Sequence, residues 1–374
     1  MFIHYPKVMT KKVILLSLIS VSMFIGCSDD SDTTSSQTST TVWEQKSQML
    51  TNWADNFIIP NYNNLSSKLS DLEMSSAAFT SNPNQQRLEL VRTTWLEAYK
   101  SWQHVEMFNV GPAEQSFYNS KMNIYPTTTE KIEALIASGE YASLDNSPYN
   151  SAQGFPALDY LLYGVASDDS SIIALYSSNP NYGSYLTEII NRMISNTNYV
   201  ITEWDSYRER FISSVENTAT SSANKMANDF IYYYEKGFRT NKIGIPIGVF
   251  SNGSQFPEKV EAYYNQNISG ILALESINAI KTFFDGNGSY SLKQFIDNFA
   301  SDELANLSSD ISAQFSLVQS NIEALDSNFA NQINNGLNQI NITYDIIQTG
   351  TVMLKTDMLT VLQIATDYVD ADGD

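Results

Sequence analysis

The sequence predicts an all-α protein built as two antiparallel helical bundles, and three observations lead to this fold class. Apolar residues recur at the helical period: between Leu304 and Ile340 they span 36 residues in ten steps, an average of 3.6. A second stripe, from Leu186 to Phe211, keeps its apolar residues on one helix face. Loops rich in Gly, Asn, Ser and Pro separate such stripes, as they do in antiparallel bundles.

The individual helices follow from the same stripes, taken in chain order. The expected helical segments are residues 43–72, 87–108, 186–211, 226–238, 260–284, 304–340 and 351–368. Asn334-Asn335-Gly336 is expected to break the 304–340 stripe into two helices. Thr127-Thr128-Thr129-Glu130 has the spacing of a capping box, which predicts a shorter helix after Pro126. Because Ile243–Phe250 contains a proline and two glycines, we expect an irregular loop there.

A polar stretch from Ser213 to Ser222 divides the predicted helices into two sets. We therefore expect an N-terminal bundle over residues 42–215 and a C-terminal bundle over residues 216–374. Each half carries a Gly-x-Pro sequence, at Gly154-Phe155-Pro156 and at Gly244-Ile245-Pro246. This repetition is consistent with a duplicated unit, although chance explains so short a match equally well.

Composition restricts the classes of function. The 374 residues include 41 acidic and 21 basic side chains, for a net charge of −20. Such a chain offers no basic face to phosphates, so we expect no nucleic-acid partner. The single cysteine excludes an internal disulfide and a thiolate zinc or iron–sulfur site, and the two histidines exclude a His-x-x-x-His zinc helix. The side chains that remain as candidates for a functional site are carboxylates, amides and phenols, and the chain has 22 tyrosines.

The N-terminus has the pattern of an exported lipoprotein. Three lysines precede an apolar run from Val13 to Ile25, which is too short to span a membrane but suits a signal-peptide core. The run ends at Gly26-Cys27, which resembles a bacterial lipobox, so we expect a signal peptide over residues 1–26 and a lipid anchor at Cys27. An ordinary signal peptide is the alternative. The acidic and Ser/Thr-rich residues 27–41 predict a flexible tether, and both the periplasm and the outer-membrane surface stay open as locations.

The sequence contains no Gly-x-Ser-x-Gly elbow, phosphate loop, dinucleotide fingerprint or Cys/His pair. His104 with Glu106 would make a metal pair without a second histidine, and a surface or core histidine is the alternative. Asp370–Asp374 starts like a calcium loop but lacks the closing acid, which favours an acidic tail.

Asp159 follows Pro156 by one helical turn. It either serves the N-terminus of its own helix or projects into a site between helices.

Spaced motifs together resemble the imelysin-like family, which includes imelysin peptidases and iron-regulated proteins: the run Trp102–Pro112, the run Gly154–Gly164 and the closing Asp370–Asp374. The resemblance covers nearly all of residues 42–374 and implies two helical bundles in an exported, often lipid-anchored protein. It also implies a metal site at the family signature Gly-x-His-x-x-Glu. In this chain Gly154 keeps the glycine, whereas Pro156 replaces the histidine and Asp159 the glutamate. The chain is therefore a variant that lacks the motif histidine.

On this resemblance we expect a lipid-anchored envelope binding protein of imelysin-like type that takes part in iron acquisition. Hard oxygen donors suit iron or another oxygen-ligated cation, and the candidate ligand-binding residues are Glu106, Asp159, Glu258, Glu261 and Lys242. Lys242 would either neutralise these acids or hold an anionic ligand. One alternative is a metallopeptidase, against which Pro156 argues. The other is a non-catalytic scaffold that binds an envelope receptor or transporter.

Overall fold

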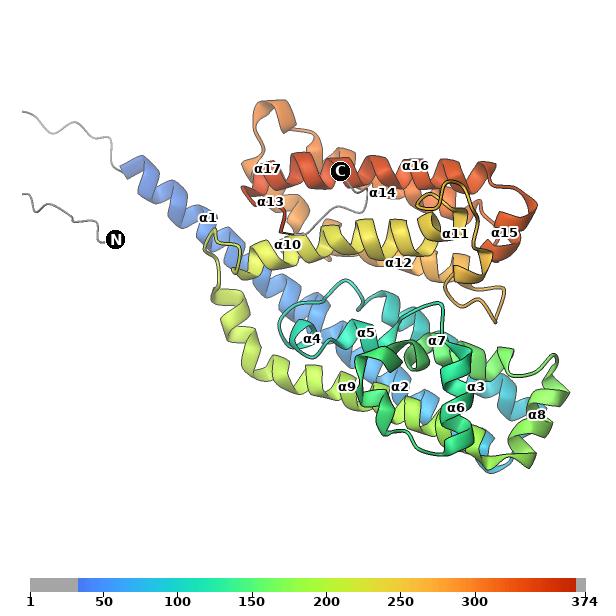
Figure 1. The fold of residues 1–374 in the computed structure, drawn as a ribbon. Helices are drawn as coiled ribbons and strands as arrows, with labels where there is room; N and C mark the ends of the chain where they lie inside the picture. The colour runs from blue at the N-terminus through green and yellow to red at the C-terminus, as the bar shows by residue number, and fades with distance from the viewer. Residues whose placement is uncertain (1–32, 368–374) are drawn as a thin grey trace, which may run out of the picture. The chain divides into compact units, whose positions relative to one another are not determined.

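The protein is helical, without strands, throughout the part that the structure describes, which confirms the all-α fold class (Figure 1). This computed structural model describes the backbone of residues 33–367 and the side chains of residues 42–367. The first half of the chain forms α1 (Thr33–Asn52), the π-helical η1 (Trp53–Ile58), α2 (Ile59–Ser81), α3 (Gln85–Gln103), α4 (Pro112–Gln115), α5 (Tyr118–Met122), α6 (Thr129–Ser138), the 3₁₀-helical η2 (Ala142–Asp145) and η3 (Ser147–Ala152), α7 (Gly154–Asp159), the π-helical η4 (Tyr160–Gly164), α8 (Asp169–Ser178) and α9 (Pro180–Ser213).

The second half begins after a polar stretch that is not helical between Ser214 and Ser221, as the sequence predicts. It forms α10 (Ser222–Tyr232), the π-helical η5 (Tyr233–Gly244), α11 (Ile245–Ile247), the 3₁₀-helical η6 (Pro257–Lys259), α12 (Ser269–Asp285), α13 (Leu292–Phe299), the 3₁₀-helical η7 (Asp302–Leu304), α14 (Leu307–Glu323), α15 (Phe329–Asn335), α16 (Asn338–Val352), the π-helical η8 (Met353–Met358) and α17 (Leu359–Leu362).

Each half packs its helices mainly against one another. In the first half α2 lies against α3 and α9, and in the second α14 lies against α12 and α16 (Figure 1). A short connection between α2 and α3 makes these two helices antiparallel. The residues from Thr41 to the last described residue nevertheless form one compact unit. The boundary near residue 215 and the duplicated unit stay predictions.

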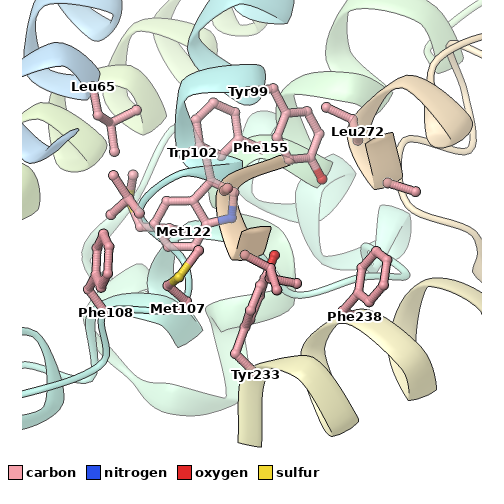
Figure 2. Packing of buried hydrophobic residues seen from close by; sticks show 14 of the residues in the cluster. Leu65, Tyr99, Trp102, Met107, Phe108, Met122, Phe155, Tyr233, Phe238 and Leu272 are labelled. Atoms are coloured by element: carbon pink, nitrogen blue, oxygen red, sulfur yellow. The ribbon is translucent and has the colours of Figure 1, made fainter. Parts of the chain in front are cut away.

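Aromatic side chains join the two halves in a common core. Phe283 on α12 lies with its ring centroid 5.1 Å from that of Trp53 and 5.4 Å from that of Phe108. Figure 2 shows Trp102 packed with Tyr99 and Phe155, which stack at 4.5 Å. Burying one such side chain contributes on the order of 2 kcal/mol. These contacts fix the end of α3 beside α12, where the candidate site lies.

The irregular loop predicted over Ile243–Phe250 is wrong for residues 243–247, which are helical because η5 runs through Gly244 and α11 continues it. Residues 248–250 form turns, as predicted. Pro246 lies at the change from π to α geometry, where a missing N–H is tolerated. The helix expected from residue 260 begins at Ser269 instead. Residues 260–268 form turns, in which Ala262 has a left-handed φ of 55°.

The stripe from 304 to 340 contains a second break besides the predicted one at Gly336. α14 ends at Glu323, and α15 starts where the backbone N–H of Phe329 donates to Ser269 Oγ at 2.9 Å. This break depends on a contact with α12, so the local pattern does not reveal it. The short helix predicted after Pro126 is confirmed as α6, but its capping box is wrong. Thr127 donates its hydroxyl to the backbone oxygen of Ser151 at 2.6 Å, and the Thr128 hydroxyl bonds to the Ser151 hydroxyl at 2.7 Å instead of capping the helix.

Several N-terminal and C-terminal predictions lie outside the described residues. These are the signal peptide (1–26), the lipidated Cys27, the first part of the tether (27–32) and the acidic tail from Asp370. Residues 33–41, predicted to be tether, belong to α1, since the helix that the apolar stripe predicts from residue 43 begins earlier, at Thr33. Among the described helices, none has both the length and the apolar character needed to cross a membrane.

Candidate functional site

A buried ion pair between Lys242 and Glu261 lies where the two halves meet. Lys242 comes from η5 and Glu261 from the turns after η6, and their side chains are 2% and 1% exposed. Lys242 Nζ contacts Glu261 Oε2 directly and also donates to Gln103 Oε1 at 2.8 Å. Gln103, the last residue of α3, donates back to Glu261 Oε1 at 3.2 Å. Hydrogen bonds from both halves thus compensate these buried charges.

Asn123, just after α5, extends this cluster to Glu106. Its amide nitrogen donates to Glu261 Oε1 at 2.8 Å and to Glu106 Oε1 at 3.0 Å. Its amide oxygen accepts from the Tyr99 hydroxyl at 2.7 Å, which fixes the orientation of the amide. Three of the predicted site residues, Glu106, Glu261 and Lys242, are therefore brought together.

The carboxyl of Glu106 has further partners besides Asn123. Its Oε2 is buried with Lys242 Nζ at 3.9 Å, and the side chains of Trp102 and Tyr233 hydrogen-bond to the carboxyl. Burial raises the pKa of Glu106 to about 6; Lys242 opposes this shift and Glu261 adds to it. Side chains from both halves thus surround this buried carboxyl.

Glu106 lines a pocket of about 470 Å³ that residues from both halves enclose. Asn119 and Tyr233 also line this pocket, and the Tyr233 hydroxyl hydrogen-bonds to the side chains of Glu106 and Ser276. Asp229 is also part of this wall, and its burial raises the pKa of its carboxyl to about 8, with Glu114 adding to the shift. The pocket has the size of a small-molecule site.

Asp159 and Glu258 lie apart from that pocket, on a cavity of about 190 Å³ that Pro156 also lines. Asp159 does not cap its own helix: its two oxygens accept the backbone N–H groups of Tyr264 at 2.7 Å and of Asn265 at 3.0 Å. Burial raises the pKa of Asp159 to about 7, although both hydrogen bonds lower it. The side chain clamps a turn of the second half onto α7.

Gly154, the retained glycine of the signature, has a steric role. Its φ is +77°, and a Cβ at this position would lie 2.1 Å from the backbone oxygen of Met122. Only glycine permits so close an approach of α7 to the end of α5. Because Asn123 follows Met122 directly, this contact also positions the amide that holds Glu106 and Glu261.

Sequence reasoning missed Gln103, Asn119, Asn123 and Tyr233. Gln103 had a usable signal, since it falls one turn after Tyr99 on the face that packs inward, and a buried amide needs partners. The other three lie in short segments without periodicity. His104 does not join Glu106: its Nε2 lies 3.1 Å from Glu275 Oε2 on a partly exposed face.

The fold and the pocket define a class: an all-α helical protein with a pocket that residues from both halves of the chain line. Residues 58–349 match the imelysin family, peptidase M75, and since this is most of the chain, the protein belongs to the imelysin family.

Solved structures share the fold. An imelysin-like protein from Psychrobacter arcticum superposes with a TM-score of 0.71 at 17% identity, over 87% of this chain and 98% of that one. An iron-regulated protein A precursor from Parabacteroides distasonis gives 0.66 at 17% identity, over 83% and 93%. Iron-regulated protein A of Synechococcus elongatus is 24% identical over 118 residues, which is 32% of this chain and 32% of that protein. The match therefore spans about a third of that relative's length.

The metal site that the family signature implies does not fit the residues present at this position. Pro156 offers no ligand atom, and both oxygens of Asp159 already accept backbone hydrogen bonds. Among residues 42–367, no group of three or more His, Cys, Asp or Glu side chains is arranged to hold a metal ion. We therefore derive no chemistry through a metal at the signature.

Proposed function

We propose that the protein is an exported, lipid-anchored binding protein of the cell envelope, which holds a positively charged ligand in the pocket beside Glu106. One observation carries this proposal: two carboxyls, those of Glu106 and Asp229, line the same pocket, and burial raises the pKa of both. Burial makes the ionised form of a carboxyl costly. A positively charged ligand in the pocket would offset this cost.

The atoms on the wall favour a cation. Asn119, which also lines the pocket, donates through Nδ2 to the backbone oxygen of Glu106 at 2.7 Å, which leaves its amide oxygen as an acceptor. Glu106 Oε2 is an acceptor when the carboxyl is ionised, and Asp229 adds a second carboxyl to the wall. A bound positive charge would favour the ionised forms of both carboxyls, whose pKa values burial raises.

Iron acquisition is the proposed context. Two relatives bear the name iron-regulated protein A, one of them as a precursor, and the lipobox-like Gly26-Cys27 supports export with a lipid anchor. We propose a non-catalytic role, with an envelope receptor or transporter as partner. A metallopeptidase would need ligands that Pro156 and the engaged Asp159 do not supply.

The pocket is tested by thermal melting of the mature protein with calcium chloride, ferric nitrilotriacetate, pentylamine hydrochloride and, as a neutral solute, glucose. At least one of the cations is expected to raise the Tm of the wild type, and glucose is not. Glu106→Gln, which removes the charge but keeps the shape, is expected to abolish this rise. Glu258→Gln, an exposed carboxylate on the other cavity, is the matched control and keeps it. The proposal fails if no cation stabilises the wild type.

The anchor is tested separately. Cys27→Ser is expected to move the protein from the membrane fraction to the soluble fraction, because it removes the thiol that carries the lipid. The measurement is cell fractionation with mass spectrometry of the mature N-terminus. Ser28→Ala is the control and stays membrane-bound. An unmodified N-terminus in the wild-type protein would show that the signal peptide is an ordinary one.

A further inference from the structure

We propose that the acidic C-terminal segment, residues 368–374, docks along α10 and η5 and binds a basic cluster formed by Lys236, Arg239 and Lys355. The occupant of this surface is thus part of the same chain, the sequence Tyr-Val-Asp-Ala-Asp-Gly-Asp, which lies outside the described residues. The inference goes beyond the proposed function, and it does not depend on a ligand in the pocket beside Glu106.

The last described residues leave the fold near the beginning of α10. Asn228, which is buried, donates through Nδ2 to the backbone oxygen of Ala365 at 3.1 Å. Its Oδ1 accepts the backbone N–H of Asp367 at 3.2 Å. Both polar ends of one buried amide therefore fix the point from which residues 368–374 start, about one helical turn before Tyr232.

Beyond this point, α10 and η5 carry an aromatic ring and then cations. Tyr232, four residues after Asn228, is 47% exposed, and Lys236 follows four residues later. Arg239 comes three residues further on, so it neighbours Lys236 on the helix surface. Tyr232 and Lys236 also line the pocket beside Glu106, and a segment docked on them lies along one edge of that pocket.

The basic cluster has a positive charge in sum. Lys355 of η8 lies with its Nζ 3.2 Å from Glu235 Oε2, and Arg239 Nη2 lies 3.6 Å from Glu235 Oε1. Two of the three cations thus share one carboxylate, and the third, Lys236, comes next to Glu235 in the chain. Because Coulomb attraction is strong where water is largely excluded, such a cluster favours an anionic partner.

The charge pattern of the C-terminal segment complements this surface. The segment begins with an uncharged pair, Tyr368 and Val369, and then contains three acids and no basic residue. The apolar pair suits the exposed ring of Tyr232. It also passes Asp229, whose carboxyl is close enough to Asp367 for the two to raise each other's repulsion, so an acid at that point would be unfavourable.

The reach of the segment agrees with this pairing. An extended chain advances about 3.3 Å per residue, so Asp370 reaches about 10 Å beyond Asp367. Lys236 lies about 12 Å along the helix from Asn228, at 1.5 Å per residue. The first acid of the segment therefore comes level with the first cation of the surface. The two later acids extend far enough for the rest of the basic cluster.

Thermal melting of the mature protein in EDTA tests the role of charge. The variant Asp370→Asn/Asp372→Asn/Asp374→Asn keeps the shape of the segment and removes its three charges. Its Tm is expected to be about 2–4 °C below that of the wild type at low salt. The difference is expected to vanish in NaCl at about 1 M, because salt screens these charges. EDTA excludes a calcium ion bound by the acids as the cause.

The matched control is Asp71→Asn/Glu73→Gln/Asp205→Asn, which removes three exposed acids from α2 and α9. The full chain has a net charge of −20, so loss of acids elsewhere reduces self-repulsion, and this control is expected to keep or raise the Tm. If neutralising the C-terminal segment leaves the Tm at the wild-type value, the inference is wrong.

A disulfide locates the segment. Cys27→Ser leaves the chain without a cysteine, so Lys236→Cys and Asp370→Cys then supply its two thiols. On mild oxidation we expect an intramolecular disulfide, which peptide mapping by mass spectrometry detects. Lys225→Cys with Asp370→Cys is the control. Lys225 lies nearer to Asn228 but in the opposite direction along α10, so an undirected segment would reach it at least as readily.

The docked segment is expected to form the disulfide with position 236 about tenfold faster than with position 225. Equal rates for the two pairs, or faster reaction at position 225, would overturn the inference. Neither this result nor an unchanged Tm bears on the proposed function, which the cation-dependent melting of Glu106→Gln tests separately.

Discussion

Lys242→Met is expected to lower the free energy of unfolding by about 3–5 kcal/mol. The methionine fills a similar volume, but it leaves Glu261 buried without its cation and Gln103 Oε1 without the Lys242 donor. Removing one partner of a buried ion pair is costly because the other charge stays desolvated. Urea denaturation at neutral pH, followed by circular dichroism, measures the change.

Two controls separate the ion pair from a general loss of packing. The double variant Lys242→Met/Glu261→Gln also removes the orphaned charge and is expected to recover more than half of the loss. Lys225→Met removes a partly exposed lysine paired with Glu114 and is expected to cost less than about 1 kcal/mol. A double variant no more stable than Lys242→Met would show that the charge of Glu261 does not cause the loss.

Asp159→Asn is expected to change how stability depends on pH. The pKa of Asp159 is about 7 in the folded protein, against an ordinary value of 3.8 that applies to the unfolded chain. Between these values the unfolded chain has released this proton and the folded protein has kept it, so stability from this group falls as pH rises. The variant has no carboxyl to titrate at this position. Its free energy of unfolding, relative to that of the wild type, is therefore expected to rise by about 2 kcal/mol between pH 5 and pH 7.

The difference between the two proteins isolates Asp159, because Glu106 and Asp229, whose pKa values are also raised, titrate in both. The measurement is a series of urea unfolding curves across this pH range. Glu258→Gln, on the same cavity but exposed, is the control and follows the wild-type profile. A constant difference between Asp159→Asn and wild type would mean that Asp159 is ionised in the folded protein throughout the range.

At the position of the expected family signature, the structure shows packing contacts. Pro156 and Asp159 do not present a ligand pair; Asp159 instead holds the turn at Tyr264 and Asn265 against α7. Gly154 makes a close backbone contact with Met122, which is independent of any metal.

Most of the helices could be predicted because their signal is local. The stripe from Leu186 to Phe211 falls within α9, and Gly336 ends α15 as expected. The start of α12 and the break before Phe329 could not be predicted, since contacts between distant segments decide both. The Thr128 hydroxyl shows the same effect on a smaller scale, because Ser151 is the partner that it takes.

The sequence by itself determined the all-α class, the family resemblance, the export and lipidation pattern at Cys27 and the absence of the motif histidine at Pro156, because each depends on residue identity or on spacing along one segment. The tertiary structure alone decided which candidates share a site. Glu106, Glu261 and Lys242 come together from distant segments, while Asp159 and Glu258 lie on another cavity. Burial between the two halves also raises the pKa of Glu106, and burial depends on how all the helices pack.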